Sequence, residues 1–270
     1  TVDVYGVFEE GALEILWRDE PRPARASLDE MVARTWARCE DEARSEGVLL
    51  FNGPMFRHLR HRVGDGRLAI EVGPTDYANF MGTNYCNYAR GDEFGWELYG
   101  NPIGTSASLI TSDGWVLYGR RSGNVACHAG YVHTFGGCLE PADRRGDGSF
   151  DGFECLRREL KEELGFEPAD VTRMVCLGLI RDATIRQPEL IFDAYVGRSR
   201  SEIEARLRPG DPHAEHESIV ALRDEAAAVV PFIRGTRRLA PIATGAVCLH
   251  GRRRFGEAWY AETVRVLAGA

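Results

Sequence analysis

A charged run near the middle of the chain, Arg158-Glu-Leu-Lys-Glu-Glu-Leu-Gly-Phe166, restricts the fold more than any other feature. Read as a helix, it spaces three glutamates by three and four residues, so that their carboxylates share one face. These are Glu159, Glu162 and Glu163. Leucines that recur every four residues predict a separate apolar stripe against a core. They are Leu156, Leu160 and Leu164. Carboxylates this close repel one another, and a hard divalent cation, magnesium or manganese, neutralises them most simply.

The same charges also suit a second interpretation. Glu, Arg and Lys are good helix formers, and Arg158 can pair with Glu162 one turn later, which is typical of a solvated helix face. The charged run alone does not decide between a solvated face and a metal site.

The segment upstream of the run favours the metal site. A glycine pair, Gly136-Gly137, leads into Leu139-Glu140-Pro141, and a loop then connects to the charged run. This arrangement resembles the Nudix box, G-x5-E-x7-R-E-U-x-E-E-x-G-U, in which U is aliphatic or aromatic. Gly137 matches the first glycine, and residues 158–166 match the second half without a gap. The middle departs in two ways: Asp143 stands where the first glutamate is expected, and fourteen residues rather than seven separate it from Arg158.

The resemblance implies a fold, a site and a reaction. The fold is the α/β Nudix sandwich, a mixed sheet between helical layers. Glu159 and Glu163 would be the principal metal ligands, and Glu162 a third ligand or the group that activates water. The Gly137 carbonyl would supply a further oxygen, and Arg158 would hold the glutamates in register. Bound magnesium would neutralise two linked phosphates and template attack of water on one phosphorus.

A narrower resemblance spans both halves of the chain and points to the UDP-glucose diphosphatase branch of the superfamily, which splits UDP-glucose into UMP and glucose 1-phosphate with magnesium. The segments that carry it are Phe51–Arg57, Thr75-x-Tyr77, Gly82–Asn84, the interrupted box, Gly178–Arg181 and Phe192-x-x-Tyr195-Val196. An appended N-terminal unit and an enlarged box loop also belong to this branch. Animal members have an eroded box, whereas this chain keeps every glutamate of the second half.

This branch supplies candidate substrate residues. Asn52, Arg57, Tyr77 and Asn84 are candidates for gripping the uridine or ribose, and Arg181 for a phosphate. Each has a structural alternative: Asn52 before Gly53 also suits a turn, Tyr77 suits a core position, and a strand arginine suits rim packing.

Two other functions remain open. One is hydrolysis of ADP-ribose or another nucleotide diphosphate by the same chemistry. The other is a non-catalytic sensor that binds nucleotide sugars in a Nudix cleft. The intact carboxylates argue against a sensor, because a pure binder gains little from three mutually repelling acids.

The domain organisation is predicted from length and local patterns. With 270 residues and 44% hydrophobic content, the chain can bury one sizeable core and a smaller appended unit. The composition changes near Asn101-Pro102, so we expect an N-terminal α+β substrate-binding unit over 1–100 and the Nudix domain over 101–270. Residues 2–5 and 13–17 read as two strands around a Glu-Gly turn, and residues 48–57 as a buried strand that breaks at Asn-Gly-Pro and resumes. Ser27 is expected to cap a helix that runs to about Glu46.

Composition also bears on partners and location. A net charge of -8 gives no general electrostatic reason to bind nucleic acid, and no apolar run approaches the ~18 residues that span a bilayer. Seven scattered cysteines without a Cys-x-x-Cys pair favour a reduced, cytoplasmic protein. The expected partner is a small-molecule nucleotide sugar, and a homodimer is a further candidate assembly.

Two weaker patterns complete the sequence. The loop 143–154 fits a calcium loop at Asp143, Asp147, Gly148, Phe150 and Glu154, but Arg145 occupies a ligand position. We favour an acidic insert beside the site. His213-x-x-His216-Glu217 could bind metal, but it follows a Pro-Gly-Asp segment and lacks the H-E-x-x-H order, so solvated loop histidines are expected.

Overall fold

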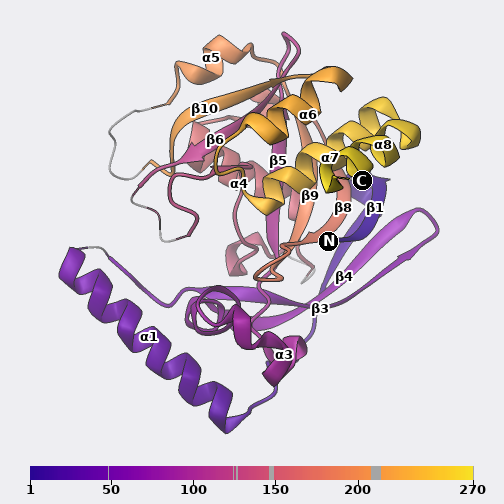
Figure 1. Ribbon diagram of the computed structural model, residues 1–270. Coiled ribbons are helices and arrows are strands. Elements are labelled where there is room, and N and C mark those ends of the chain that lie inside the picture. Colours follow the sequence, from indigo (N-terminus) through magenta and orange to yellow (C-terminus); the bar gives the residue numbers. More distant parts are fainter. Residues whose placement is uncertain (48, 124, 126, 146–148, 208–213, 270) are drawn as a thin grey trace.

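The computed structural model describes residues 1–47, 49–123, 125, 127–145, 149–207 and 214–269. Within them the main element is a seven-stranded sheet with the order β1-β8-β9-β5-β6-β10, and β7 also pairs with β6 (Figure 1). The strand bounds are Val2–Phe8 (β1), Gly104–Ile110 (β5), Trp115–Arg121 (β6), Val132–His133 (β7), Val171–Arg181 (β8), Pro188–Val196 (β9) and His216–Arg223 (β10). The sheet is mixed, because β5 runs parallel to β9 and its other pairings are antiparallel.

Helices cover both faces of this sheet. On one face lies α4 (Gly152–Leu164), and on the other lie α6 (Ala226–Gly235), α7 (Pro241–Phe255) and α8 (Glu257–Ala268). All seven residues of β5 are buried, which is typical of a strand covered on both sides. Leu109 packs in the same core cluster as the α4 leucines, whereas Ile110 belongs to a cluster with Ala243 and Val247 of α7. The predicted α/β sandwich with a mixed sheet is therefore confirmed.

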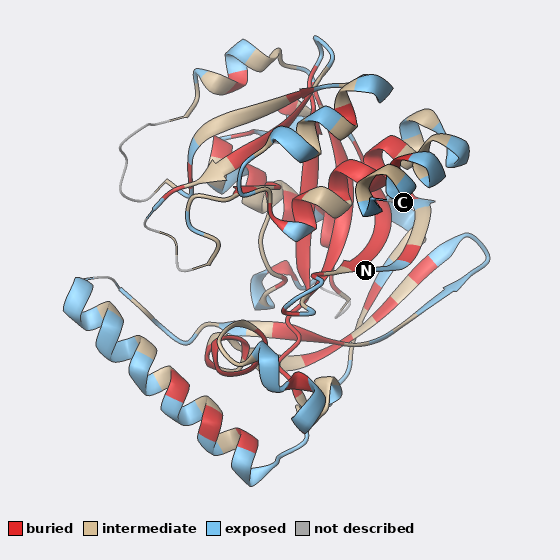
Figure 2. Cartoon of the chain, viewed as in Figure 1, coloured by how far each residue is buried: buried red, intermediate tan, exposed pale blue. Residues whose placement is uncertain are grey.

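A smaller sheet lies below the large one in Figure 1, with the order β2-β4-β3. Its strands are Leu13–Trp17 (β2), Pro54–Gly64 (β3) and Arg67–Asp76 (β4). Long helix α1 (Ala26–Glu46) lies beside it and ends at Gly47, which takes a left-handed φ of 68°. Only the first half of α1 is buried, at Leu28, Met31 and Thr35 (Figure 2). The remaining elements are α2 (Tyr77–Phe80), α3 (Gly91–Phe94), α5 (Arg200–Glu204), a π-helical turn at Met81–Tyr85 and 3-10 turns at Glu10–Ala12, Tyr88–Arg90, Trp96–Leu98, Pro141–Asp143 and Pro168–Asp170.

Two local predictions were wrong. Ser27 does not cap α1, because the N-cap is Arg25, whose backbone N–H donates to the carboxylate of Asp29 at 3.0 Å. The described residues 49–51 form no strand, and β3 begins only at Pro54, since Leu49 and Phe51 are exposed rather than packed.

The two strands predicted before and after the Glu-Gly turn are confirmed as β1 and β2. They lie in different sheets, because β1 joins the large sheet beside β8 and β2 runs parallel to β4 in the small sheet. The division at residue 100 stays a prediction, but residues 2–8 lie in the sheet that the second part of the chain forms.

All seven cysteines are free thiols. Within the described part of the chain, no helix combines the length and apolar character needed to cross a membrane.

Candidate functional site

The charged run forms α4, as predicted, and each end of this helix has a local cause. Asp151 precedes it and accepts a hydrogen bond from the Phe153 N–H at 2.9 Å, which satisfies one of the free donors of the first turn. Gly165 ends it with a φ of 63°. The stripe Leu156, Leu160 and Leu164 is buried in the main core cluster, so the helix is held on the sheet through that side.

Two of the three glutamates turn away from water. The side chains of Glu159 and Glu163 are 13% and 4% exposed, whereas that of Glu162 is 59% exposed. The glycine pair makes room for them: a Cβ at Gly137 would lie 2.3 Å from Glu159 Oε1, and the Gly136 N–H donates to Glu163 Oε1 at 3.4 Å. The loop and the helix of the box therefore meet at these two carboxylates.

Arg158 links the acids of this region. Its guanidinium contacts Asp143 Oδ1 at 3.1 Å and Oδ2 at 3.2 Å, Glu159 Oε1 at 2.9 Å and Glu162 Oε2 at 3.5 Å. Asp143 is buried and also accepts from the Glu140 N–H, so it fixes the far side of the guanidinium. The aspartate that departs from the box pattern thus holds Arg158 beside the glutamates despite the longer loop.

The two buried carboxyls have strongly altered acidity. Burial raises the pKa of Glu159 to about 8 against the opposing charge of Arg158, and the charges of Glu163 and Glu162 add to the rise. Burial, followed by the charge of Glu215, raises the pKa of Glu163 well above its usual range. Glu163 Oε2 is also buried without a hydrogen-bond partner among the described residues. Burial outweighs the charge of Arg158 at Glu159, and Glu163 has an unpartnered oxygen among the described residues, so a divalent cation would supply positive charge that both groups need and the residues present fit a metal.

Strand β10 brings in residues that the sequence interpretation missed. Glu215 and His216 lie with Glu163 so that one ligand atom from each falls within 4.8 Å of the others. His216 is 3% exposed, which overturns the prediction of a solvated loop histidine for this residue. His213 lies outside the described residues. Burial and then the charge of Arg121 lower the pKa of His216 to about 4, so the ring is neutral near pH 7.

Arg121, at the end of β6, adds a positive group beside this cluster. It pairs with His216 across β6 and β10, and its Nη1 lies 3.3 Å from Glu215 Oε2. The sequence signal for His216 was the His-x-x-His-Glu pattern, but its spacing alone does not reveal that the second histidine begins a buried strand.

The Gly137 carbonyl, predicted as an extra metal ligand, already accepts two hydrogen bonds. The Thr105 N–H donates to it at 2.7 Å and the Thr105 hydroxyl at 3.3 Å. These bonds anchor the box loop to β5 and use both lone pairs of the oxygen.

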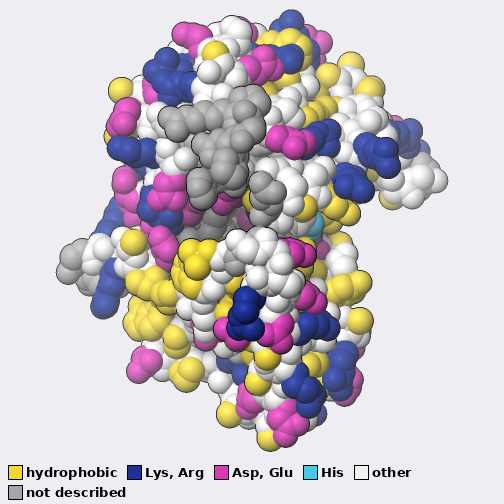
Figure 3. Space-filling model, turned by 90° about the vertical axis from the view of Figure 1, so that its left-hand side faces the viewer, with side chains coloured by type: hydrophobic (Ala, Val, Ile, Leu, Met, Phe, Trp, Pro, Cys, Tyr) yellow, Lys and Arg dark blue, Asp and Glu magenta, His cyan; other side chains and the backbone are white. Residues whose placement is uncertain are grey.

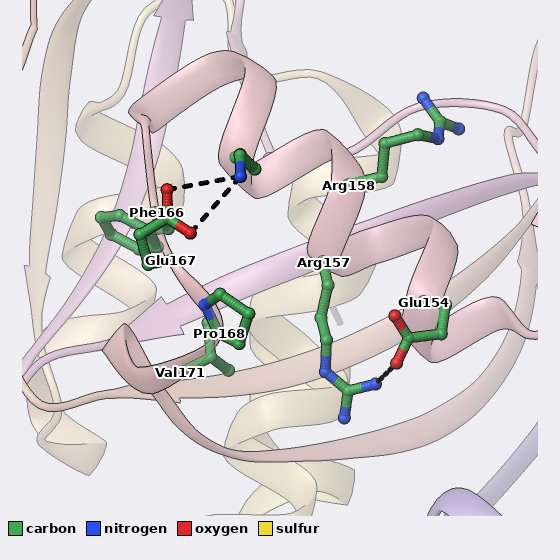
Figure 4. Close-up of a pocket in the computed structure, with 8 residues that line it drawn as sticks. Glu154, Arg157, Arg158, Phe166, Glu167, Pro168 and Val171 are labelled. Carbon is green, nitrogen blue, oxygen red and sulfur yellow. Dashed lines mark hydrogen bonds and ion pairs between the residues drawn. The ribbon is translucent and has the colours of Figure 1, made fainter.

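The outward side of α4 carries a different pocket, of about 230 Å³ (Figure 4). Its lining includes Glu154, Arg157 and Lys161, but none of the three box glutamates. Arg157 pairs with Glu154, and Lys161 lies 3.3 Å from a Glu167 oxygen. This surface therefore resembles the solvated helix face considered above, and the buried carboxylates of Glu159 and Glu163 lie elsewhere on the helix.

The structure brings together two of the predicted substrate residues. Arg57 and Arg181 line one pocket of about 470 Å³ with His58, Trp96 and Arg186. Arg57 is 5% exposed, donates to the Glu97 carbonyl at 2.7 Å and has no hydrogen-bond partner for its buried Nε among the described residues. Arg181 pairs with Asp3.

The other three predicted substrate residues lie outside that lining. Asn84 is fully buried and uses both donors and both acceptor positions within the protein, with Asn101, Thr83 and the Ile185 carbonyl. It has no polar atom left for a substrate. Asn52 accepts from the Ala78 N–H at 2.8 Å, which ties residue 52 to the first turn of α2.

Tyr77 lies edge-on to Trp36, with its hydroxyl 4.0 Å from Cys127 Sγ.

On the side of the molecule turned to the viewer in Figure 3, hydrophobic side chains gather on the lower half, which α1 and the small sheet form. Phe51, the first residue of the predicted substrate segment, is 72% exposed.

The described acids of the loop 143–154 make contacts within the protein other than calcium binding. Asp143 binds Arg158, Asp151 caps α4, and Glu154 pairs with Arg157. Asp147 and Gly148, two positions of the calcium pattern, lie outside the described residues.

The raised pKa of Glu159 predicts a metal-dependent pH profile of stability. Between its ordinary pKa of 4.5 and the folded value of about 8, the folded state binds more protons than the unfolded state, so the metal-free protein loses stability as pH rises through this window. A cation favours the ionised form and offsets the loss. Thermal unfolding from pH 5 to 8 should show a falling midpoint in a chelator, a smaller fall with magnesium or manganese, and a flatter chelator curve for Glu159→Gln. A midpoint that rises with pH in chelator would contradict this assignment.

Comparison with known proteins agrees with this geometry. No family model matches the chain. The uridine diphosphate glucose pyrophosphatase NUDT22 of Bos taurus is 26% identical over 233 residues, which span 75% of this chain and 79% of that protein. Nudix hydrolase 9 of Arabidopsis thaliana is 24% identical over 200 residues, 66% of this chain and 60% of that protein. Among solved structures, the MutT protein of Methanosarcina mazei Go1 has a TM-score of 0.37 and 18% identity, covering 56% of this chain and 93% of that chain, and a likeness of this size carries no argument of its own.

The buried acids of α4 suit a divalent metal. In the box helix, in its glycine pair and in its curated relatives, this chain resembles the Nudix hydrolases and, among them, the UDP-glucose pyrophosphatases.

Proposed function

We propose that the chain hydrolyses the diphosphate of a nucleoside diphosphate sugar with magnesium, and that UDP-glucose is the substrate, giving UMP and glucose 1-phosphate. The observation that carries the proposal is the pair of buried carboxylates, Glu159 and Glu163, which α4 and the glycine pair bring together. The curated relatives named as UDP-glucose pyrophosphatases support the choice of substrate.

Each residue of the box has a separate task in this proposal. Glu159 and Glu163 hold the cation, which when bound neutralises the two phosphates and makes a coordinated water more acidic. Arg158 keeps Glu159 in place through its contact at 2.9 Å. Glu162 is the exposed acid of the three and lies on the solvent side, where it is available to take a proton from water.

The pocket that contains Arg57 and Arg181 is our proposed site for the nucleotide part of the substrate. Asn101 lines this pocket, and Thr105 holds the box loop four residues later. Four residues of chain span at most about 14 Å. An extended nucleotide sugar can therefore reach from this pocket to the box loop beside the acids. Guanidinium groups bind phosphate and carboxylate oxygens in a fork geometry, and the buried Arg57 Nε has a donor to offer.

Replacing Arg57 tests this placement. Arg57→Met keeps the apolar stem, so the pocket walls should persist while the charged donor is lost. We expect KM for UDP-glucose to rise about tenfold, which is the loss of roughly 1.4 kcal/mol of binding, with a smaller change in kcat. Arg60→Met is the matched control, because Arg60 is an exposed residue of the same strand that pairs with Glu71. Equal KM values in the two variants would remove the nucleotide from this pocket.

The reaction itself is tested by a substrate panel. UDP-glucose, UDP-galactose, a UDP-N-acetylated sugar and ADP-ribose are incubated with magnesium, and nucleoside monophosphates are separated by chromatography. We expect UMP from UDP-glucose to form fastest. Faster release of AMP from ADP-ribose would favour the general nucleotide diphosphate hydrolase. UDP-glucose binding by calorimetry without UMP release, in magnesium and in manganese, would favour the sensor.

A further inference from the structure

His216 opens β10 in a setting built around its ring. A Cβ at Gly119 of β6 would lie 2.2 Å from His216 Nδ1, so position 119 must be a glycine to admit the imidazole. Phe135 packs edge-on against the ring with a centroid distance of 4.9 Å. The ring is thereby held by strand, glycine and aromatic contacts.

Both ring nitrogens lack a hydrogen-bond partner among the residues that the structure describes, although the residue is 3% exposed. Buried polar groups in folded proteins nearly always have a partner, and those without one call for an explanation such as an unseen ion. Glu163 Oε1 lies 3.5 Å from His216 Nε2, and Glu163 Oε2 is itself buried without a partner in the described part of the chain.

We propose that His216 is a nitrogen ligand of the cation that Glu159 and Glu163 hold, with Glu215 as a further carboxylate ligand, and that this site therefore selects a first-row transition ion such as Mn²⁺ over Mg²⁺. The inference rests on the metal site of the proposed function and specifies its donor set. One potential ligand atom from each of Glu163, Glu215 and His216 lies within 4.8 Å of the other two. Metal bonds of about 2.1 Å place ligand atoms up to about 4.2 Å apart, so small side-chain rotations close the site.

The choice of ion follows from the mixed donors. Magnesium prefers oxygen ligands and keeps several waters, whereas imidazole nitrogen suits transition ions, and carboxylates also suit manganese. A site of carboxylate oxygens alone would not favour manganese in this way. Arg121, which lies 3.3 Å from Glu215 Oε2 without metal, would lose this partner when Glu215 turns to the cation.

Pulsed electron paramagnetic resonance on the full chain with Mn²⁺ tests the donor set directly. A coordinated imidazole gives ¹⁴N modulations of the Mn²⁺ echo, and labelling the protein with ¹⁵N-histidine should change their frequencies. The modulations should vanish in His216→Gln and persist in His61→Gln, a matched control on β3 that contacts His58 instead of the box. Calorimetry should show Mn²⁺ affinity about tenfold weaker or more in His216→Gln, with a smaller change for Mg²⁺.

The outcomes separate this inference from the proposed function. Mn²⁺ that binds wild-type protein without ¹⁴N modulation overturns the nitrogen ligand and leaves the hydrolase intact. Failure of the wild-type protein to bind either ion, together with no UMP release, overturns both. If His216→Gln fails to fold by circular dichroism, the labelled wild-type protein still decides.

Discussion

Glu163→Gln is expected to lower the turnover of UDP-glucose by about two orders of magnitude or more, which corresponds to roughly 2.7 kcal/mol of transition-state stabilisation. Glutamine keeps the shape of the side chain and the hydrogen bond from the Gly136 N–H, but it removes the negative charge that the cation needs. Turnover is measured as UMP formation at saturating substrate and magnesium, so that weaker binding does not mimic a chemical defect.

The folded state should tolerate this change. Glu163 is a buried acid with an unpartnered oxygen among the described residues, so a neutral amide is expected to leave the metal-free unfolding midpoint unchanged or higher. Glu167→Gln is the matched control, since Glu167 pairs with Lys161 on the outward side of α4 and should retain full activity. Turnover of Glu163→Gln within a few fold of wild type would exclude the box acids as the metal centre.

His250→Gln is expected to cost about 3 kcal/mol of folding free energy at pH 7, because it removes the buried positive charge that two carboxylates share and leaves each of them with a single arginine partner. His250 is 1% exposed and lies between Asp193 (Nδ1 to Oδ1, 3.0 Å) and Asp224 (Nε2 to Oδ1, 3.1 Å). Asp193 keeps Arg253 as a second partner at 3.0 Å. These contacts tie α7 to β9 and to the end of β10, so their loss should lower the thermal midpoint by roughly 6 to 12 °C.

The pH dependence of this loss has a definite sign. Burial alone would lower the pKa of His250, but the carboxylates of Asp193 and Asp224 outweigh it and raise the pKa to about 9. The folded value exceeds the ordinary 6.5, so the stabilisation is complete below pH 6.5 and is lost as pH rises to about 9. Urea unfolding at pH 6.5 and pH 9.5 should therefore show a smaller difference between variant and wild type at the higher pH. His61→Gln, without a buried acid partner, should differ little from wild type at either pH, and a His250→Gln defect that does not change with pH would contradict the ion pair.

The sequence predicted α4 well because its causes are local. The leucine spacing, the Asp151 cap and the Gly165 terminus all lie within one stretch of chain, and Arg158 shares that stretch with the glutamates. The same local causes act in β5 and β6, which the Ser-Asp-Gly turn of residues 112–114 joins and which pair antiparallel.

The missing parts of the site depend on distant pairings. His216 reaches Glu163 only because β10 pairs with β6 in a register that places it opposite Arg121, and no local pattern encodes that register. Asn84 shows a second limit of prediction from sequence. An asparagine can contact a substrate or can join buried segments of the protein, and only its hydrogen bonds with Asn101 and Ile185 show that it has the second role.

The pairing of β1 with β8 has a consequence for how the chain reaches its native state. Val2 lies opposite Ile180, so about two thirds of the chain must be synthesised before β1 can pair with β8. During synthesis the small sheet can form earlier, while β1 stays an unpaired edge. Closing such a long-range contact slows folding, and removal of residues 1–100 would strip the border strand from β8. A shortened chain that begins after residue 100 should therefore aggregate more readily than the whole chain.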